Sequence, residues 1–113
     1  YLYVEEADDA ANKVSQRKRS GFIMKRVRVQ ISGLVQGVCF RAATKQVAAN
    51  LNLTGWVRNT QDRRVEAVFE GDDAAVQKIV DWCQVGPPAA RVDKVMAMEE
   101  QFTGSFPGFS IKY

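Results

Sequence analysis

The sequence predicts one α+β domain in which two helices cover one face of a mostly antiparallel sheet. Two observations lead to this prediction. From Lys25 onward apolar and polar residues alternate, as in a half-buried strand. Further on, apolar residues twice recur at spacings of three and four, as in amphipathic helices. The order strand, helix, strand, strand, helix, strand, with a short last strand, is the ferredoxin-like split βαβ pattern.

The first half of this order begins with a strand around residues 27–31. A glycine-bounded loop follows at residues 33–39, and a helix is expected from Phe40 until Asn50-Leu51-Asn52 ends it. The apolar stripe of this helix consists of Phe40, Ala43, Val47 and Leu51. Residues 56–59 and 65–69 predict two strands, joined by a hairpin loop over residues 60–64.

The second helix is expected to follow the Asp72-Asp73 pair, of which one residue caps it. This reading is preferred to a metal site because an amphipathic helix follows directly. Its apolar stripe consists of Val76, Ile79, Val80 and Cys83, and Gly86-Pro87-Pro88 ends it. Residues 92–98 and 109–112 predict the last two strands. Six aromatic residues are expected in the core or on a sheet face: Phe40, Trp56, Phe69, Trp82, Phe102 and Phe109.

Two segments are expected within the 113 residues. Residues 1–23 read as a polar leader whose four basic and four acidic residues cancel, either an upstream extension or a remnant of an expression vector. Residues 24–113 form the domain. No signal peptide or bilayer-length apolar run is evident, so we expect a cytoplasmic protein. The net charge of +3 suits small anionic substrates and falls short of a nucleic-acid-binding surface.

The absence of histidine constrains the chemistry. It excludes a Ser-His-Asp triad, a Cys-His pair and a phosphohistidine. Two cysteines without histidine cannot form a zinc site. Cys39 and Cys83 are expected to be reduced, packed thiols.

The segment Gly33-Leu34-Val35-Gln36-Gly37-Val38-Cys39-Phe40-Arg41 leads from a strand into a helix. Unpaired N–H groups at a helix start, the helix dipole and an arginine together form a cup for a phosphate group. A tight turn that needs glycine only for backbone freedom explains the same loop. The loop alone does not decide between these two readings.

Asn59 follows the predicted strand at residues 56–59. If Val57 faces the helices, Asn59 faces them too, because side chains alternate along a strand. Ile31 and Gly33 share the equivalent face of the first strand, so the loop and Asn59 can meet. A hairpin-turn role for Asn59 is the alternative.

Further segments follow at characteristic spacings: Gly55-Trp56-Val57-Arg58-Asn59, residues 65–71, residues 86–92 and Phe106-Pro107-Gly108-Phe109-Ser110-Ile111. With the loop, they closely resemble acylphosphatase, which hydrolyses carboxyl–phosphate anhydrides. The resemblance runs from about Met24 to Tyr113. One departure is Asp62-Arg63-Arg64, where the family usually has Asp-Gly.

The resemblance implies that the site is made by the loop, Arg41 and Asn59. Backbone N–H groups of Val35, Gln36, Gly37, Val38 and Cys39 wrap the phosphate. Arg41 orients it, and Asn59 holds the attacking water. A carboxylate leaves without a general acid, so neither a metal nor another cofactor is expected.

The expected partner is a small acyl phosphate, with inorganic phosphate or sulfate as a competing anion. We expect neither a nucleic acid nor a membrane as a partner, and we expect the protein to be a monomer. One alternative is a non-catalytic module that binds phosphate or carbamoyl phosphate. Another is an RNA binder, which would need exposed aromatic residues on the two central strands.

Overall fold

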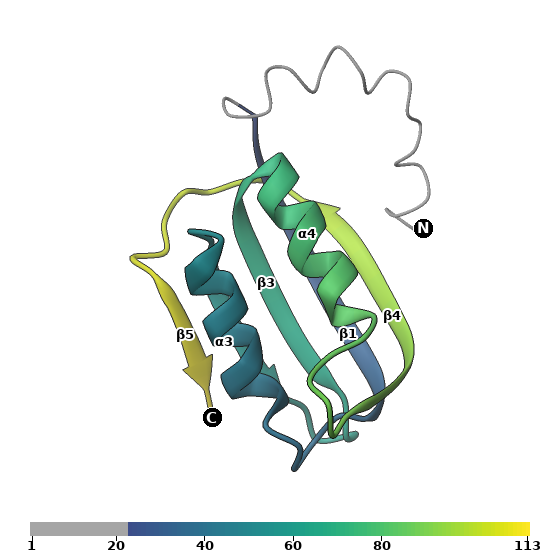
Figure 1. The fold of residues 1–113 in the computed structure, drawn as a ribbon. Helices are drawn as coiled ribbons and strands as arrows, with labels where there is room; N and C mark the ends of the chain where they lie inside the picture. The colour runs from purple at the N-terminus through teal and green to yellow at the C-terminus, as the bar shows by residue number, and fades with distance from the viewer. Residues whose placement is uncertain (1–22) are drawn as a thin grey trace, which may run out of the picture.

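The computed structural model describes residues 23–113, which form five strands and two helices (Figure 1). The predicted leader, apart from Ile23, lies outside the described residues. The elements follow in the order β1 (Met24–Leu34), α3 (Phe40–Asn50), β2 (Thr54–Asn59), β3 (Val65–Asp72), α4 (Asp73–Cys83), β4 (Arg91–Glu100) and β5 (Phe109–Lys112). This is the predicted element order. β1, β2, β3 and β4 are longer than predicted because pairing extends beyond the apolar alternation.

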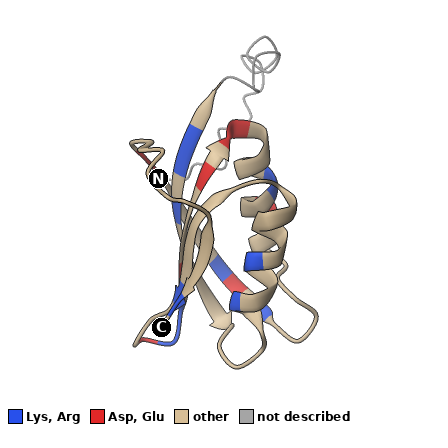
Figure 2. Cartoon of the chain, turned by 90° about the vertical axis from the view of Figure 1, so that its left-hand side faces the viewer, with Lys and Arg blue, Asp and Glu red and all other residues tan. Residues whose placement is uncertain are grey.

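The strands form one sheet in the order β4-β1-β3-β2-β5. The β1–β3, β1–β4 and β2–β3 pairs are antiparallel, whereas β2 and β5 are parallel. Both helices lie on one side of this sheet, as the side view shows (Figure 2). The α+β ferredoxin-like prediction is therefore confirmed.

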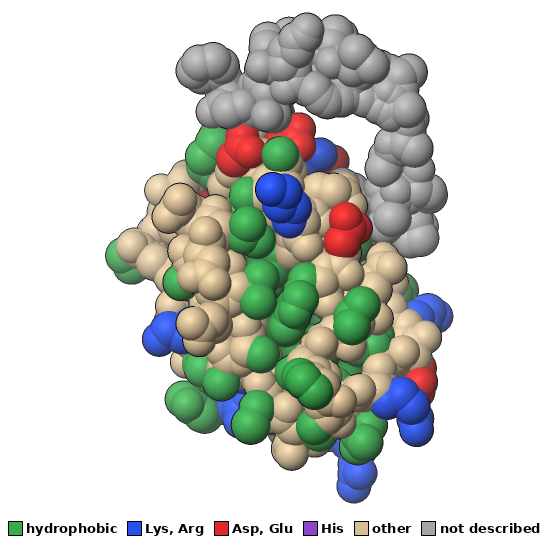
Figure 3. All heavy atoms as spheres, in the orientation of Figure 1, with side chains coloured by type: hydrophobic (Ala, Val, Ile, Leu, Met, Phe, Trp, Pro, Cys, Tyr) green, Lys and Arg blue, Asp and Glu red, His purple; other side chains and the backbone are tan. Residues whose placement is uncertain are grey.

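The core lies between the sheet and the helices. Val27, Val29 and Ile31 are fully buried in β1 and alternate with half-buried residues. All four residues of the predicted α4 stripe are buried. Asp72 caps this helix, and its carboxylate accepts a hydrogen bond from the Ala74 N–H at 3.2 Å. On the side of the molecule that the helices cover, a band of hydrophobic side chains runs along the middle of the space-filling view (Figure 3).

The buried stripe of α3 differs from the prediction. Phe40, Thr44 and Ala48 are its buried residues, whereas Ala43, Val47 and Leu51 of the predicted stripe are only partly buried. Thr44 can be buried because its hydroxyl donates to the Phe40 carbonyl at 2.8 Å, which satisfies its polar atom. A pattern based on apolar residue types misses such a threonine.

On the opposite face of the sheet, β1 presents arginines and the neighbouring β3 presents glutamates. Trp56 lies there, 8% exposed, beneath the cations of Arg28, Arg58 and Lys112. The central strands β1 and β3 present Arg26, Arg28, Gln30, Glu66, Val68 and Glu70 on this face, with no aromatic residue among them. The aromatic stacking surface of an RNA binder is therefore missing from these strands. Between residues 23 and 113, neither helix is long and apolar enough to cross a membrane.

Candidate active site

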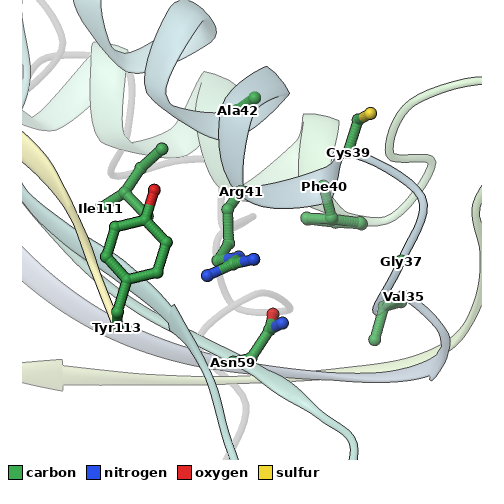
Figure 4. A pocket seen from close by; sticks show the side chains of 9 residues that line it. All are labelled: Val35, Gly37, Cys39, Phe40, Arg41, Ala42, Asn59, Ile111 and Tyr113. Carbon is green, nitrogen blue, oxygen red and sulfur yellow. The ribbon is translucent and has the colours of Figure 1, made fainter.

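A cavity of about 360 Å³ lies where the start of α3 meets the ends of β2 and β5 (Figure 4). Its lining comes from segments far apart in the sequence: the loop before α3, the first turn of α3, the last residue of β2, and the end of the described chain. The lining residues are Val35, Gly37, Cys39, Phe40, Arg41, Ala42, Asn59, Ile111 and Tyr113.

Arg41 and Asn59 project into this cavity from different elements. Arg41 is the second residue of α3, and Asn59 is the last residue of β2. Their side chains point toward one another across the same space (Figure 4). The two residues predicted to act together are therefore neighbours in the fold, as strand alternation permits. Their chemical roles stay predictions.

The start of α3 has backbone donors that no side chain caps. Cys39 occupies the N-cap position with φ 64° and makes no side-chain capping hydrogen bond, and the first turn contains no acidic residue. The first N–H groups of a helix have no intrahelical acceptors, and the helix dipole gives this end a partial positive charge. With the Arg41 guanidinium beside it, this end of α3 suits an anion.

The predicted loop residues divide into two groups. Val35, Gly37 and Cys39 line the cavity, whereas Gln36 and Val38 are not among the lining residues. Val38 packs against the core, and Gln36 directs its side chain toward the hairpin after Asn59. Gly37 has φ 77°, a left-handed conformation that glycine adopts without steric cost.

The prediction that Cys39 is a packed thiol is wrong. Cys39 is exposed, and its sulfur points away from Arg41 and Asn59 (Figure 4). Its left-handed backbone at the start of the helix turns the side chain outward. Cys83 is buried as predicted, and this burial raises the pKa of its thiol.

The hairpin loop after Asn59 keeps a tight turn without glycine. Arg63 takes the left-handed conformation with φ 68°, which glycine adopts without steric cost. A residue other than glycine in this region costs about 1–2 kcal/mol. Arg63 in place of glycine therefore raises the conformational free energy of the turn, but it leaves Asn59 at the cavity.

Two lining residues near the end of the chain, Ile111 and Tyr113, were not predicted as site residues. The parallel pairing of β5 with β2 puts Ile111 opposite Val57, and Tyr113 follows two positions later. The Tyr113 ring lies under the Arg41 guanidinium, 5.0 Å from its centroid. The sequence offered a weak signal, since Ile111 alternates with polar residues, but it did not specify the strand beside β5.

No acidic residue is among the described residues that line the cavity. Arg41 therefore gives the cavity a net positive field. Within residues 23–113, no group of three or more histidine, cysteine, aspartate or glutamate side chains is placed to hold a metal ion.

Comparisons with known proteins place this geometry in a family. The acylphosphatase family model matches residues 27–111. The acylphosphatase of Rubrobacter xylanophilus is 53% identical over 88 residues, which cover 78% of this chain and 80% of that protein. The acylphosphatase of Roseiflexus sp. is 54% identical over 78% of this chain and 95% of its own length. The Bacillus subtilis acylphosphatase structure is 34% identical, with a TM-score of 0.76 over 80% of this chain and 100% of that one. This chain belongs to the acylphosphatase family.

Proposed function

We propose that this protein hydrolyses the carboxyl–phosphate anhydride bond of acyl phosphates, with Arg41 and Asn59 as its catalytic residues. The observation that carries the proposal is the convergence of these two side chains on one cavity at an uncapped helix start. The products are a carboxylate and inorganic phosphate.

The phosphate group binds at the N-terminal end of α3. Backbone N–H groups of residues 35–39 donate to its oxygens, and the planar Arg41 guanidinium donates two parallel hydrogen bonds. The ring of Tyr113 lies beneath the guanidinium and makes a cation–π contact with it at 5.0 Å. Fixed donors of this kind stabilise the charge on the equatorial oxygens of the transferred phosphoryl group.

Asn59 holds the attacking water on the side of the cavity opposite α3. Its amide positions the water for in-line attack at phosphorus, while the carboxylate leaves from the other side. Asparagine cannot act as a base, so the water proton passes to a phosphoryl oxygen of the substrate. The leaving carboxylic acid has a pKa of about 4, and the carboxylate therefore departs without a proton donor.

The alternative, a module that binds phosphate or carbamoyl phosphate without catalysis, is not favoured. The chain spans 80% and 95% of the lengths of two relatives that are themselves acylphosphatases. Three further proposals follow from the site and the sequence. Inorganic phosphate and sulfate compete with the substrate, the protein acts as a monomer, and it works in the cytoplasm, where Cys39 and Cys83 stay reduced.

The test is hydrolysis of benzoyl phosphate, followed by phosphate release. Arg41→Ala should abolish both activity and phosphate binding. Asn59→Ala should lower kcat on the order of 10²-fold or more and leave the inhibition constant of phosphate nearly unchanged. The matched controls are Arg91→Ala and Asn50→Ala, two exposed positions outside the cavity. Activity that survives in Arg41→Ala would refute the proposed phosphate site.

A further inference from the structure

The side chain of Gln36 makes two hydrogen bonds that link the loop before α3 to the hairpin after Asn59. Its Nε2 donates to the Thr60 carbonyl and to the Arg64 carbonyl, each at 2.9 Å. Both partners are acceptors, so the pair of contacts requires a group with two N–H donors. A glutamine amide meets this requirement, whereas a glutamate carboxylate has no proton to donate.

The two carbonyls that Gln36 binds belong to the two ends of the hairpin loop. Thr60 directly follows Asn59, and Arg64 directly precedes Val65, the residue that pairs with Asn59 across the β2–β3 ladder. The hairpin also closes on itself, because the Thr60 N–H donates to the Arg64 carbonyl at 2.9 Å. The Gln36 amide therefore binds a rigid unit at the point where Asn59 leaves the sheet.

The backbone of Gln36 lies between Val35 and Gly37, which both line the cavity of the proposed phosphate site. Its side chain therefore ties the loop of that site to the strand end that presents Asn59. This arrangement sets the spacing between the bound phosphorus and the water that Asn59 holds. In-line attack depends steeply on that spacing, since a misplacement of about 1 Å can cost on the order of 10²-fold in rate.

We infer that Gln36 is a positioning residue that acts through Asn59. Its side chain holds the water-binding amide at the correct distance from the phosphate cup and contributes little to phosphate affinity. This inference rests on the proposed function, because it needs Asn59 to hold the attacking water.

The test is a double-mutant cycle on benzoyl phosphate hydrolysis. Gln36→Met keeps the length of the side chain and removes both donors. It should lower kcat about 10-fold while the inhibition constant of phosphate changes less than about 2-fold. Gln36→Glu should lower kcat further, since its carboxylate repels both carbonyls. In the Asn59→Ala background Gln36→Met should have no further effect on kcat.

Gln61→Ala is the matched control, because Gln61 is an exposed glutamine in the same hairpin. It should leave kcat unchanged. All variants are to be assayed below their thermal unfolding midpoints, so that loss of the fold does not enter kcat. An equal fall in kcat in both backgrounds, or a large rise in the phosphate inhibition constant, would overturn the inference alone. Full activity in Asn59→Ala would overturn the proposed function as well.

Discussion

Glu70 is a charged residue in β3 that is only 1% exposed, and four donors surround its carboxylate. Oε2 accepts from the Arg26 guanidinium at 3.1 Å, the Thr103 N–H at 3.0 Å and the Thr103 hydroxyl at 2.9 Å. Oε1 accepts from the Gly104 N–H at 2.9 Å. Glu70 therefore fixes the loop that connects β4 to β5, the strand that brings Ile111 and Tyr113 to the cavity.

We predict that Glu70→Gln destabilises the domain by about 3 kcal/mol. Removal of one partner from a buried ion pair costs about 3–5 kcal/mol, and the amide oxygen of glutamine retains part of the interaction at Oε2. Its NH₂ group then faces the Gly104 N–H, so two donors oppose each other. The measurement is the free energy of unfolding in urea at pH 7. Asp93→Asn, in an exposed pair with Arg91, is the control and should leave the urea midpoint unchanged.

The destabilisation caused by Glu70→Gln should also depend on pH. Burial alone would raise the pKa of Glu70, but the donors from Thr103, Gly104 and Arg26 outweigh it and hold the pKa below its usual value. Because the folded-state pKa is lowered, the stabilisation is fully present above the unfolded-state pKa and is lost as the pH falls through the folded-state pKa. The difference between wild type and Glu70→Gln should therefore be constant near neutral pH and shrink in acid. Two results would refute this account. One is a shift of the urea midpoint in Glu70→Gln that is no larger than that in Asp93→Asn. The other is a difference in unfolding free energy between wild type and Glu70→Gln that does not change with pH.

Three other predictions concern the site and its hairpin. Arg41→Lys should recover little of the activity lost in Arg41→Ala, because a point charge cannot replace the planar guanidinium, and a near-normal kcat would argue against bidentate binding. Arg63→Gly should raise the free energy of unfolding by up to about 1 kcal/mol, because glycine removes a left-handed cost of about 1–2 kcal/mol while its greater freedom in the unfolded chain offsets about 0.4–1 kcal/mol, and a lower urea midpoint would contradict this. EDTA should leave the rate of benzoyl phosphate hydrolysis unchanged, and the rate should show no bell-shaped profile across the histidine range, as chelator and pH titrations would establish.

Local signals in the sequence predicted most of the fold. Alternation in β1 and the Asp72 cap of α4 depend on neighbouring residues, so both could be read without the tertiary structure. Arg41 and Asn59 were chosen as site residues through the resemblance to acylphosphatase, and strand alternation only permitted them to meet.

The features that were missed depend on contacts between distant segments. Thr44 is buried because its hydroxyl finds an acceptor one turn back, which the residue type does not reveal. Tyr113 reaches the cavity only because β5 lies parallel to β2. The outward position of Cys39 follows from its backbone angle, which no apolar pattern encodes.

The sheet topology also has a consequence for folding kinetics. β1 lies between β3 and β4, so its partners come from much later in the chain, and Arg26 and Glu100 are 74 positions apart. Closing such long loops costs entropy before the contacts form, and domains with many distant pairings fold on millisecond-to-second timescales. The last cavity residues, Ile111 and Tyr113, arrive only when β5 docks on β2. A chain emerging from the ribosome therefore completes this cavity only after synthesis has passed Tyr113.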